Sequence, residues 1–528
     1  MQTQRKNPII FICLIACLAG FLFAPSGHAI HVQEKRLQNY IDQHFGTALD
    51  LSPHELNQIL WLARAGSQPP GGVHSLNYYP LEREIMRLLN RLYNLALLRK
   101  GDETSYLYFT QPQREENYDK PVLSQQTFDR LSRWFNNPET LSEDGYVALR
   151  AATIISAVAH TRLARDKAQQ IWDNEGAGPV PQDGMEFLWA TVNHDTAVYP
   201  LLDALSTEQR SLLLAAFLPD SHLRHMLYAE GSSAMFYRLI DSFQRQQTEP
   251  ALSRDAFNFW FMTWLVDISG FWVNPAIPDG SYYLNEAEAQ DILKQWRLLT
   301  DALFNQSRRQ PRDVIAQKLL KDYLVYRANA LRLPSIPVGD LAVYGGLASL
   351  LRIHTHEQAN QLHEAHKRLS TSQRKALRAI YADKLAACPL KTPTYLPAVF
   401  VNLLDAGANF QHSFELFIDI YIQSMNLMKA RYQSGELQSD KPVSFKALAN
   451  VAGMIAGWPS VSIQIKGYDV LVRPAKVRSN TAIEQTGTLQ GHHRSVDRFI
   501  FLNHKTLSSA TLLPFTGQVS ESAYLPAI

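Results

Sequence analysis

The segment from residue 255 to residue 275 constrains the fold more than any other part of the chain, because aromatic rings crowd it on every side. On a helical wheel these rings leave no solvated face, so we predict a single helix of about four turns that other elements must enclose. Ser253 can serve as its N-cap and Gly270 as its left-handed C-terminal stop. A bundle of several helices is the architecture that can enclose such a segment. The rings belong to Phe257, Phe259, Trp260, Phe261, Trp264, Phe271 and Trp272.

The first 29 residues have the pattern of a secretory signal peptide. Basic residues at 5–6 precede an apolar run at 9–23, and Gly27 and Ala29 are small residues suited to a cleaving peptidase. We expect cleavage after Ala29 and export to the periplasm or the cell exterior. One alternative is an uncleaved anchor, because the run is only slightly shorter than the roughly 17 to 25 residues of a spanning helix. The other is lipid attachment at Cys17.

Charge and cysteine content narrow the class of the mature protein. Cleavage removes two basic residues and no acids, so the formal charge falls from +2 to 0. A chain without net charge is not a general nucleic-acid binder. Cys13 and Cys17 leave with the signal peptide, so Cys388 has no disulfide partner and the core must hold the fold. No other segment is long and apolar enough to cross a bilayer.

Helical periodicity and capping signals follow one another along most of the chain. The strongest start is Ser52, which is followed by Pro53 and closes a capping box with Glu55. One short strand is predicted at Ser105–Thr110. The fold class is therefore mainly α, an irregular multi-helix bundle with one or two helical domains. Further helices are predicted at approximately 32–45, 80–100, 125–136, 143–172, 184–204, 207–217, 220–229, 233–245, 285–305, 313–331, 340–353, 355–369, 371–387, 397–406 and 412–433.

A small β element is predicted near the C-terminus. Residues 460–466 and 468–473 alternate with period two on either side of Gly467, and Phe499–Leu502 is a candidate third strand. The segment 333–340 is rich in proline and ends in Gly-Asp, which marks a domain boundary. The predicted organisation is a signal peptide at 1–29, an N-terminal helical domain at 30–335, a second helical domain or a continuation of the first at 336–436, a small α+β element at 437–504 and an irregular tail at 505–528.

Four ionisable residues form the first candidate site, His160, His194, Asp195 and Asp267. Asp267 is a carboxylate among the rings of the aromatic helix, and it must find donors, a cation or a proton. His194 lies at the centre of the apolar arc of its helix, so its ring is predicted to point into the core. His160 ends the apolar run 151–160. Imidazole nitrogens and carboxylate oxygens suit a divalent ion, which can lower the pKa of a bound water for hydrolysis.

The order of these residues, a His, an adjacent His-Asp pair and a later Asp, resembles the pattern of the HD superfamily of metal-dependent phosphohydrolases. The resemblance covers only these four positions, and it implies a metal-dependent hydrolase. The chain departs from the family after Asp195, where Pro200 kinks or ends the helix instead of a small or glycine-containing turn. In the structural alternative His194 donates to a carbonyl, while Asp195 and Asp267 are held by arginine side chains or helix-end amides.

A second candidate is the histidine-rich segment 353–366. His363 and His366 are one turn apart, about 4.5 Å along the axis, so they could share one ion. His356 is roughly 10 Å from His363 along the axis and cannot join them without a bend. The apolar stripe of this helix passes beside His366, and a solvated, histidine-rich helix face is the expected role of the segment.

The remaining candidates have simpler explanations. His222 and His225 are expected at the surface or near His194, Asp419 is expected to pair with a lysine or arginine, and Cys388 is expected to be an inert thiol. The sequence contains no nucleophile elbow, no Walker A loop and no dinucleotide-binding glycine motif.

Two functions are compatible with these features. The first is an exported helical protein that binds or interacts with an unidentified partner, because the catalytic signals are weak. The alternative is a metal-dependent hydrolase built on the four-residue set. No catalytic residue is assigned, no cofactor motif is found, and a divalent metal is implied only in the second case.

Overall fold

The computed structural model describes residues 27–475, apart from short gaps. The gaps are residues 67–80, 116–117, 119, 182, 195–196, 219–221, 246–249, 272–279, 307–309, 334, 387–391, 408 and 439–440. The described chain divides into two compact units. The first unit comprises residues up to Arg224 together with 238–309, and the second comprises 225–237 together with the residues from Gln310 on. The chain thus passes between the units at 224–225, 237–238 and 309–310, and the predicted domain bounds stay a prediction.

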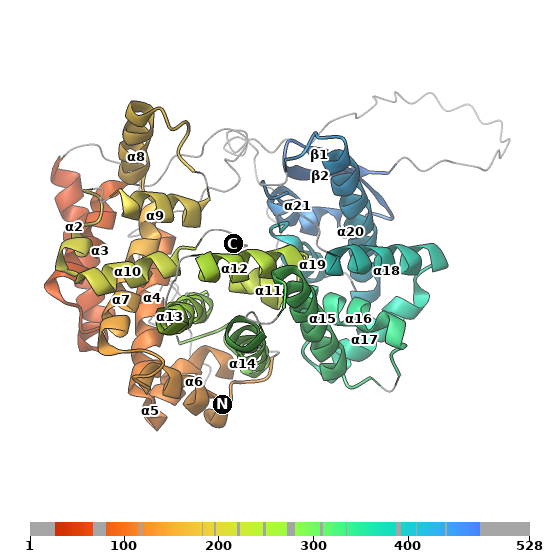
Figure 1. Ribbon diagram of the computed structural model, residues 1–528, viewed down its shortest axis with the longest axis horizontal. Coiled ribbons are helices and arrows are strands. Elements are labelled where there is room, and N and C mark those ends of the chain that lie inside the picture. The colour runs from red at the N-terminus through yellow and green to blue at the C-terminus, as the bar shows by residue number, and fades with distance from the viewer. Residues whose placement is uncertain are drawn as a thin grey trace, which may run out of the picture. The chain divides into compact units, whose positions relative to one another are not determined.

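The first unit is helical throughout its described part (Figure 1). Two helices carry the chain across the division between the units, α11 (Leu223–Leu227) and α12 (Ser233–Arg245). The elements of the first unit are α2 (Gly27–His44), η1 (Gly46–Ala48), α3 (Pro53–Ala65), α4 (Leu81–Lys100), α5 (Glu103–Phe109), η3 (Gln111–Arg114), α6 (Gln125–Asn136), α7 (Glu143–Ile155), η4 (Ser156–His160), α8 (Arg162–Glu175), α9 (Gly184–Asn193), η5 (Pro200–Ala204), α10 (Thr207–Ala216), α13 (Pro250–Ser269), α14 (Glu286–Asp301) and η6 (Ala302–Gln306).

The aromatic helix α13 is the core of the first unit, as predicted. It packs against α4, α7 and α10 (Figure 1). Phe257 and Trp260 are fully buried, and Trp264 is buried as well. The predicted start was wrong, because the helix begins at Pro250 and not after Ser253. The predicted end before Gly270 is confirmed, because the helix ends at Ser269, but Gly270 does not adopt a left-handed conformation. Glycine is required there because a Cβ would lie 2.3 Å from Cγ of Arg91 on α4.

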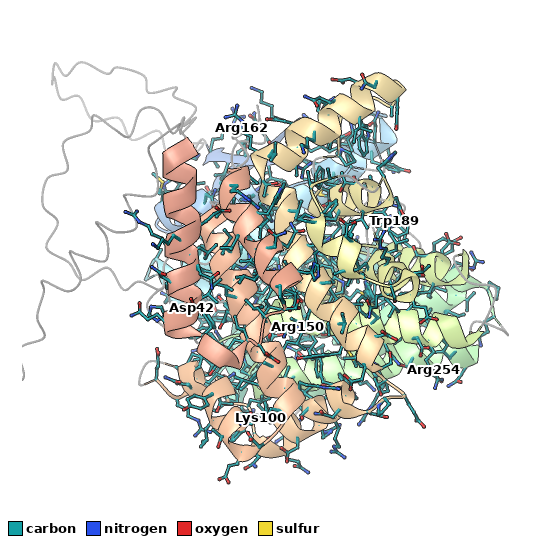
Figure 2. The ribbon with its side chains drawn as sticks, turned by 90° about the vertical axis from the view of Figure 1, so that its left-hand side faces the viewer. Asp42, Lys100, Arg150, Arg162, Trp189 and Arg254 are labelled. Carbon is teal, nitrogen blue, oxygen red and sulfur yellow. The ribbon has the colours of Figure 1, made fainter. Side chains whose placement is uncertain are left out.

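The capping box predicted at Ser52 is confirmed at the start of α3, and its glutamate has a second role. Nε of Arg150 lies 2.7 Å and Nη2 lies 3.0 Å from the two carboxylate oxygens of Glu55. Arg150 is on α7 in the interior of the first unit (Figure 2). This buried, two-point ion pair fixes α3 against α7.

Three local predictions in the first unit were wrong. The strand predicted at Ser105–Thr110 is the helix α5, because Asp102 caps it by accepting from the amide of Ser105. The helix predicted at 143–172 is interrupted by η4, and Thr161 caps a new helix after it. The helix predicted at 184–204 ends at Asn193, and Pro200 begins a short 3-10 turn instead of continuing it.

The second unit is a group of helices with one small sheet at its C-terminal end (Figure 1). Its helices α15 and α16 pack so closely that a Cβ on Gly345 would lie 1.8 Å from the carbonyl oxygen of Leu324. Its elements after α12 are α15 (Arg312–Ala330), η7 (Val338–Asp340), α16 (Leu341–Leu350), α17 (His356–Arg368), α18 (Thr371–Leu385), α19 (Leu396–Asp405), α20 (Phe410–Gln433), α21 (Lys446–Ile455), β1 (Val461–Lys466) and β2 (Asp469–Pro474).

The predicted C-terminal hairpin is confirmed. β1 and β2 are antiparallel, and the register pairs Val461 with Pro474 and Lys466 with Asp469. Parallel bridges continue the sheet beyond β2 through Ser444 to Thr394, so β1 forms the other edge. The candidate strand Phe499–Leu502 and the irregular tail at 505–528 lie outside the described residues.

Two composition-based expectations can be compared with the described chain. None of its helices is both long enough and apolar enough to span a bilayer. All three cysteines lie outside the described residues, so no disulfide joins any of the residues that the structure describes. The mainly α fold with a small C-terminal β element agrees with the prediction.

Candidate functional site

His160 and Asp267 both border a polar network on α4. Nε2 of His160 lies 3.9 Å from Oε2 of Glu84, and Oδ1 of Asp267 lies 2.5 Å from Nη2 of Arg91. Glu84 also accepts from Nη1 of Arg87 at 2.7 Å. The carboxylate of Asp267 therefore has an arginine partner, as the structural alternative predicts.

The charge of Glu84 is stabilised although its side chain is almost fully buried. Burial alone would raise the pKa of this carboxyl, but Arg87, His160 and Arg91 lower it to about 2. Burial lowers the pKa of His160, although 37% of its side chain remains exposed. The network thus keeps Glu84 ionised as a structural anion between two arginines of its own helix.

His194 does not point into the core, and this expectation was wrong. It caps the C-terminus of α9, and 38% of its side chain is exposed. Its ring packs 5.1 Å from that of Trp172, and its Nδ1 lies 3.7 Å from Glu175. The helix ends one residue earlier, so the wheel that placed His194 among apolar neighbours does not apply. Asp195 lies outside the described residues.

The structure describes three of the four residues in the predicted metal site. Among the residues that the structure describes, no group of three or more His, Cys, Asp or Glu side chains is arranged to hold a metal ion. His160 and Asp267 face Glu84 and Arg91 respectively, and His194 faces Glu175. The complete four-residue set stays a prediction, because Asp195 belongs to it.

The histidine-rich helix α17 is less solvated than expected. His356 is exposed, but His366 is buried, and burial lowers the pKa of His366 to about 4. Nδ1 of His363 is 2.9 Å from the hydroxyl of Tyr344, whose ring also lies 4.7 Å from that of His366. This tyrosine, on α16, ties the two helices together, which gives the pair of histidines a packing role.

The remaining candidates have structural partners. The ring of His222 packs 4.6 Å from that of Trp264, and Nδ1 of His225 is 3.1 Å from Oε1 of Glu230. Asp419 accepts from the amide of Gln373 at 3.2 Å, where a lysine or arginine was expected. Cys388 lies outside the described residues.

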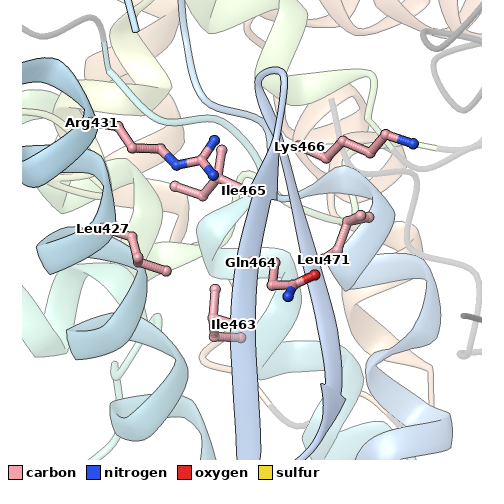
Figure 3. A pocket seen from close by; sticks show the side chains of 7 residues that line it. All are labelled: Leu427, Arg431, Ile463, Gln464, Ile465, Lys466 and Leu471. Atoms are coloured by element: carbon pink, nitrogen blue, oxygen red, sulfur yellow. The ribbon is translucent and has the colours of Figure 1, made fainter. Parts of the chain in front are cut away.

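A hollow between α20 and β1 is a site that sequence reasoning missed (Figure 3). Its volume is about 470 Å³, and its walls are mainly apolar with one basic residue on each side. Three α20 residues that face β1, namely Gln423, Leu427 and Arg431, recur every four positions and therefore share one helix face. This spacing is the one sequence signal that could have indicated the hollow. The lining residues are Leu427, Arg431, Ile463, Gln464, Ile465, Lys466 and Leu471.

The open edge of β1 lies along this hollow. Gln423 accepts from the amide of Ile463 at 3.2 Å and donates to the carbonyl of Val461 at 3.0 Å, so the first half of the edge is satisfied. In an antiparallel ladder, every second residue of a strand directs its amide and carbonyl away from the partner strand. Ile465 lies two residues after Ile463, so its amide and carbonyl also point away from β2. Within the described chain no hydrogen-bond partner is found for these two groups.

Comparison of the chain with protein-family models, with curated proteins and with solved structures gives no match.

Proposed function

We propose that this is an exported binding protein that captures an extended polypeptide segment by adding it as a strand to the edge of β1. The observation that carries the proposal is the hollow beside Ile465. An edge strand offers unpaired backbone groups to another chain, and pockets beside it select side chains. The signal peptide pattern supports export.

The number of unpaired backbone groups on β1 sets the length of the polypeptide segment that can bind there. The carbonyl of Ile463 and the two backbone groups of Ile465 remain for a partner, since Gln423 occupies the groups before them. At about 3.3 Å per residue, a partner of roughly three residues covers that stretch. The apolar side chains of such a partner would contact Leu427 on α20.

The basic residues at the rim of the hollow indicate which charge the partner should carry. Arg431 lies at one side of the hollow and Lys466 at the end of β1 (Figure 3). Arg431 is only loosely engaged by Glu436, at 3.6 Å, and both of these side chains are partly exposed. An acidic residue in the partner would gain from the positive charge of Arg431, so we expect apolar segments that carry at least one Asp or Glu.

Selection from a displayed library of random linear peptides tests the proposal. The full mature chain should enrich alternating apolar sequences with an acidic residue. Leu427→Glu should abolish their binding, and Arg431→Glu should weaken acidic peptides by about tenfold, the effect of one lost rim contact of roughly 1.4 kcal/mol. Arg368→Glu, on the exposed face of α17, is the matched control and should bind as the wild type does.

Two results would contradict the proposal. One is a wild-type selection without any enriched sequence family. The other is equal binding by the wild type and by Leu427→Glu, provided that the melting temperatures agree.

A further inference from the structure

The second unit contains a buried lysine that holds a bend of the main chain. Nζ of Lys384, on α18, donates to the carbonyl oxygens of Ala229 and Glu230, at 2.8 and 2.9 Å. Only 3% of the residue is exposed. Ala229 has a φ of 49°, which an L-residue adopts only when its surroundings hold it there. The lysine therefore stabilises a backbone conformation that is unfavourable on its own.

The bend belongs to a segment with an unusual place in the chain. Residues 225–237 are part of the second unit, although the residues on both sides of them along the chain are part of the first. Two further side chains of the second unit hold the same bend. The hydroxyl of Tyr323 donates to the carbonyl of Leu227 at 2.7 Å, and the guanidinium of Arg352 lies 4.5 Å from the ring centroid of Tyr228.

The environment of the amine is poor in compensating charge. Within the described residues no carboxylate oxygen lies within salt-bridge distance of Nζ, and Glu230 reaches it through its carbonyl. The titratable groups that face it are Glu230 at the bend, Tyr381 on its own helix and Tyr421 on α20, and His225 contacts the side chain of Glu230. An ammonium group enclosed in this way loses hydration that two carbonyls replace only in part.

We propose that Lys384 is a proton-operated clasp for residues 225–237: the neutral amine holds the bend in the buried site, and the segment opens more readily as the pH falls, because the exposed amine of the opened segment takes up a proton. Burial lowers the pKa of Lys384 to about 7, against about 10.5 in an opened segment. Because the folded value is the lower one, the opened segment binds more protons between pH 7 and pH 10.5. The clasp is therefore tightest above that range and weakens as the pH falls towards 7. Burial raises the pKa values of Tyr381 and Tyr421, so both phenols stay neutral.

Hydrogen exchange of residues 225–237 in the full chain, corrected for intrinsic rates, tests the clasp. Protection should rise about tenfold from pH 6 to pH 8, as the two pKa values require. Lys384→Met should remove this dependence. Lys384→Arg keeps its charge at every pH and should show low protection at both values. Protection of α7, in the first unit, should not follow this change.

Two controls separate the clasp from other titrating groups. His225→Gln should keep the dependence, because Nδ1 of His225 contacts the side chain of Glu230, whereas Lys384 donates to the main-chain carbonyls of Ala229 and Glu230. Lys446→Met removes another largely buried lysine of the second unit and should also keep it. A flat wild-type profile would overturn the proposal. So would a pH dependence that survives in Lys384→Met, and if neither Lys384 variant folds, the wild-type and His225→Gln profiles still decide it.

Discussion

Nη2 of Arg91, on α4, lies 2.5 Å from Oδ1 of Asp267 on the aromatic helix. The carboxylate that made a metal site conceivable is thus held by a cation from the neighbouring helix. The same arginine contacts Ser156 at 3.3 Å and helps to lower the pKa of Glu84. Asp267 is one end of a structural network along α4. The network passes through Arg91 to Glu84, which lies about two turns closer to the N-terminus of the helix.

Removal of one partner of this pair should destabilise the first unit. Asp267→Ala should cost about 3 kcal/mol, the low end of the range for buried pairs, because 21% of the Asp267 side chain is exposed. A matched change in the exposed pair of Asp322 with Lys318, Asp322→Ala, should cost under about 0.5 kcal/mol. Urea unfolding measures both. Equal losses in the two variants would show that Arg91 does not depend on Asp267.

The aromatic helix should tolerate truncation poorly. Trp264 is buried on α13, and we expect Trp264→Ala to cost roughly 3 to 5 kcal/mol through lost burial and the cavity left behind. Trp189 on α9 is only half-buried (Figure 2) and provides the control, with a clearly smaller loss. An unfolding midpoint that Trp264→Ala leaves unchanged would mean that α13 is not the core.

Acid should destabilise the first unit through Glu84. Its folded pKa of about 2 lies below the usual 4.5, so its stabilising effect is complete above pH 4.5 and is lost as the pH falls towards 2. The loss can reach roughly 3 kcal/mol. His160 acts in the same direction below pH 6.5, because burial lowers its pKa. Glu84→Gln should flatten the dependence of the urea midpoint on pH between 5 and 3, whereas Glu103→Gln, at the surface, should not.

Metal analysis of the purified mature protein addresses the alternative function. We expect no stoichiometric divalent ion, because Asp267 is bound by Arg91 and His194 faces Glu175 at the surface. A bound ion that disappears in His194→Ala would instead support the hydrolase, and Asp195 would then be the next residue to change.

Export can be tested at the N-terminus of the mature chain. Cleavage after Ala29 predicts Ile30 as the first residue, within the first turn of α2, which begins at Gly27. N-terminal sequencing of protein from the cell envelope and medium gives the answer directly. An intact Met1 would favour the uncleaved anchor, and a lipid-modified Cys17 would favour attachment.

Local sequence patterns predicted the elements that depend on their own residues. The aromatic helix, the capping box at Ser52 and the C-terminal hairpin follow from composition, spacing and caps, and all three are present. The errors arose where a distant or competing contact decides. A wheel drawn through Asn193 could not show that the helix ends there, and alternating aromatics at 105–110 hid the cap provided by Asp102.

The hollow beside β1 and the buried site of Lys384 could not be predicted from the sequence. The hollow needs α20 and β1 side by side, and the clasp needs Lys384 to meet a bend about 155 residues earlier in the chain. The four-residue spacing on α20 marks a shared helix face but not the strand beside it, and no local motif marks Lys384, because both sites depend on the packing of separate segments. In the sequence Lys384 resembles any other lysine near the end of a helix.

The two hydrogen bonds of Gln423 have a consequence for how the protein behaves at high concentration. An uncovered sheet edge invites copies of the same chain to stack without limit, and a single amide side chain occupies the start of this one. What stays open is too short to nucleate a fibre. Gln423→Ala would leave more backbone groups of the β1 edge unpaired. The variant should precipitate or polymerise under conditions in which the wild-type protein stays in solution.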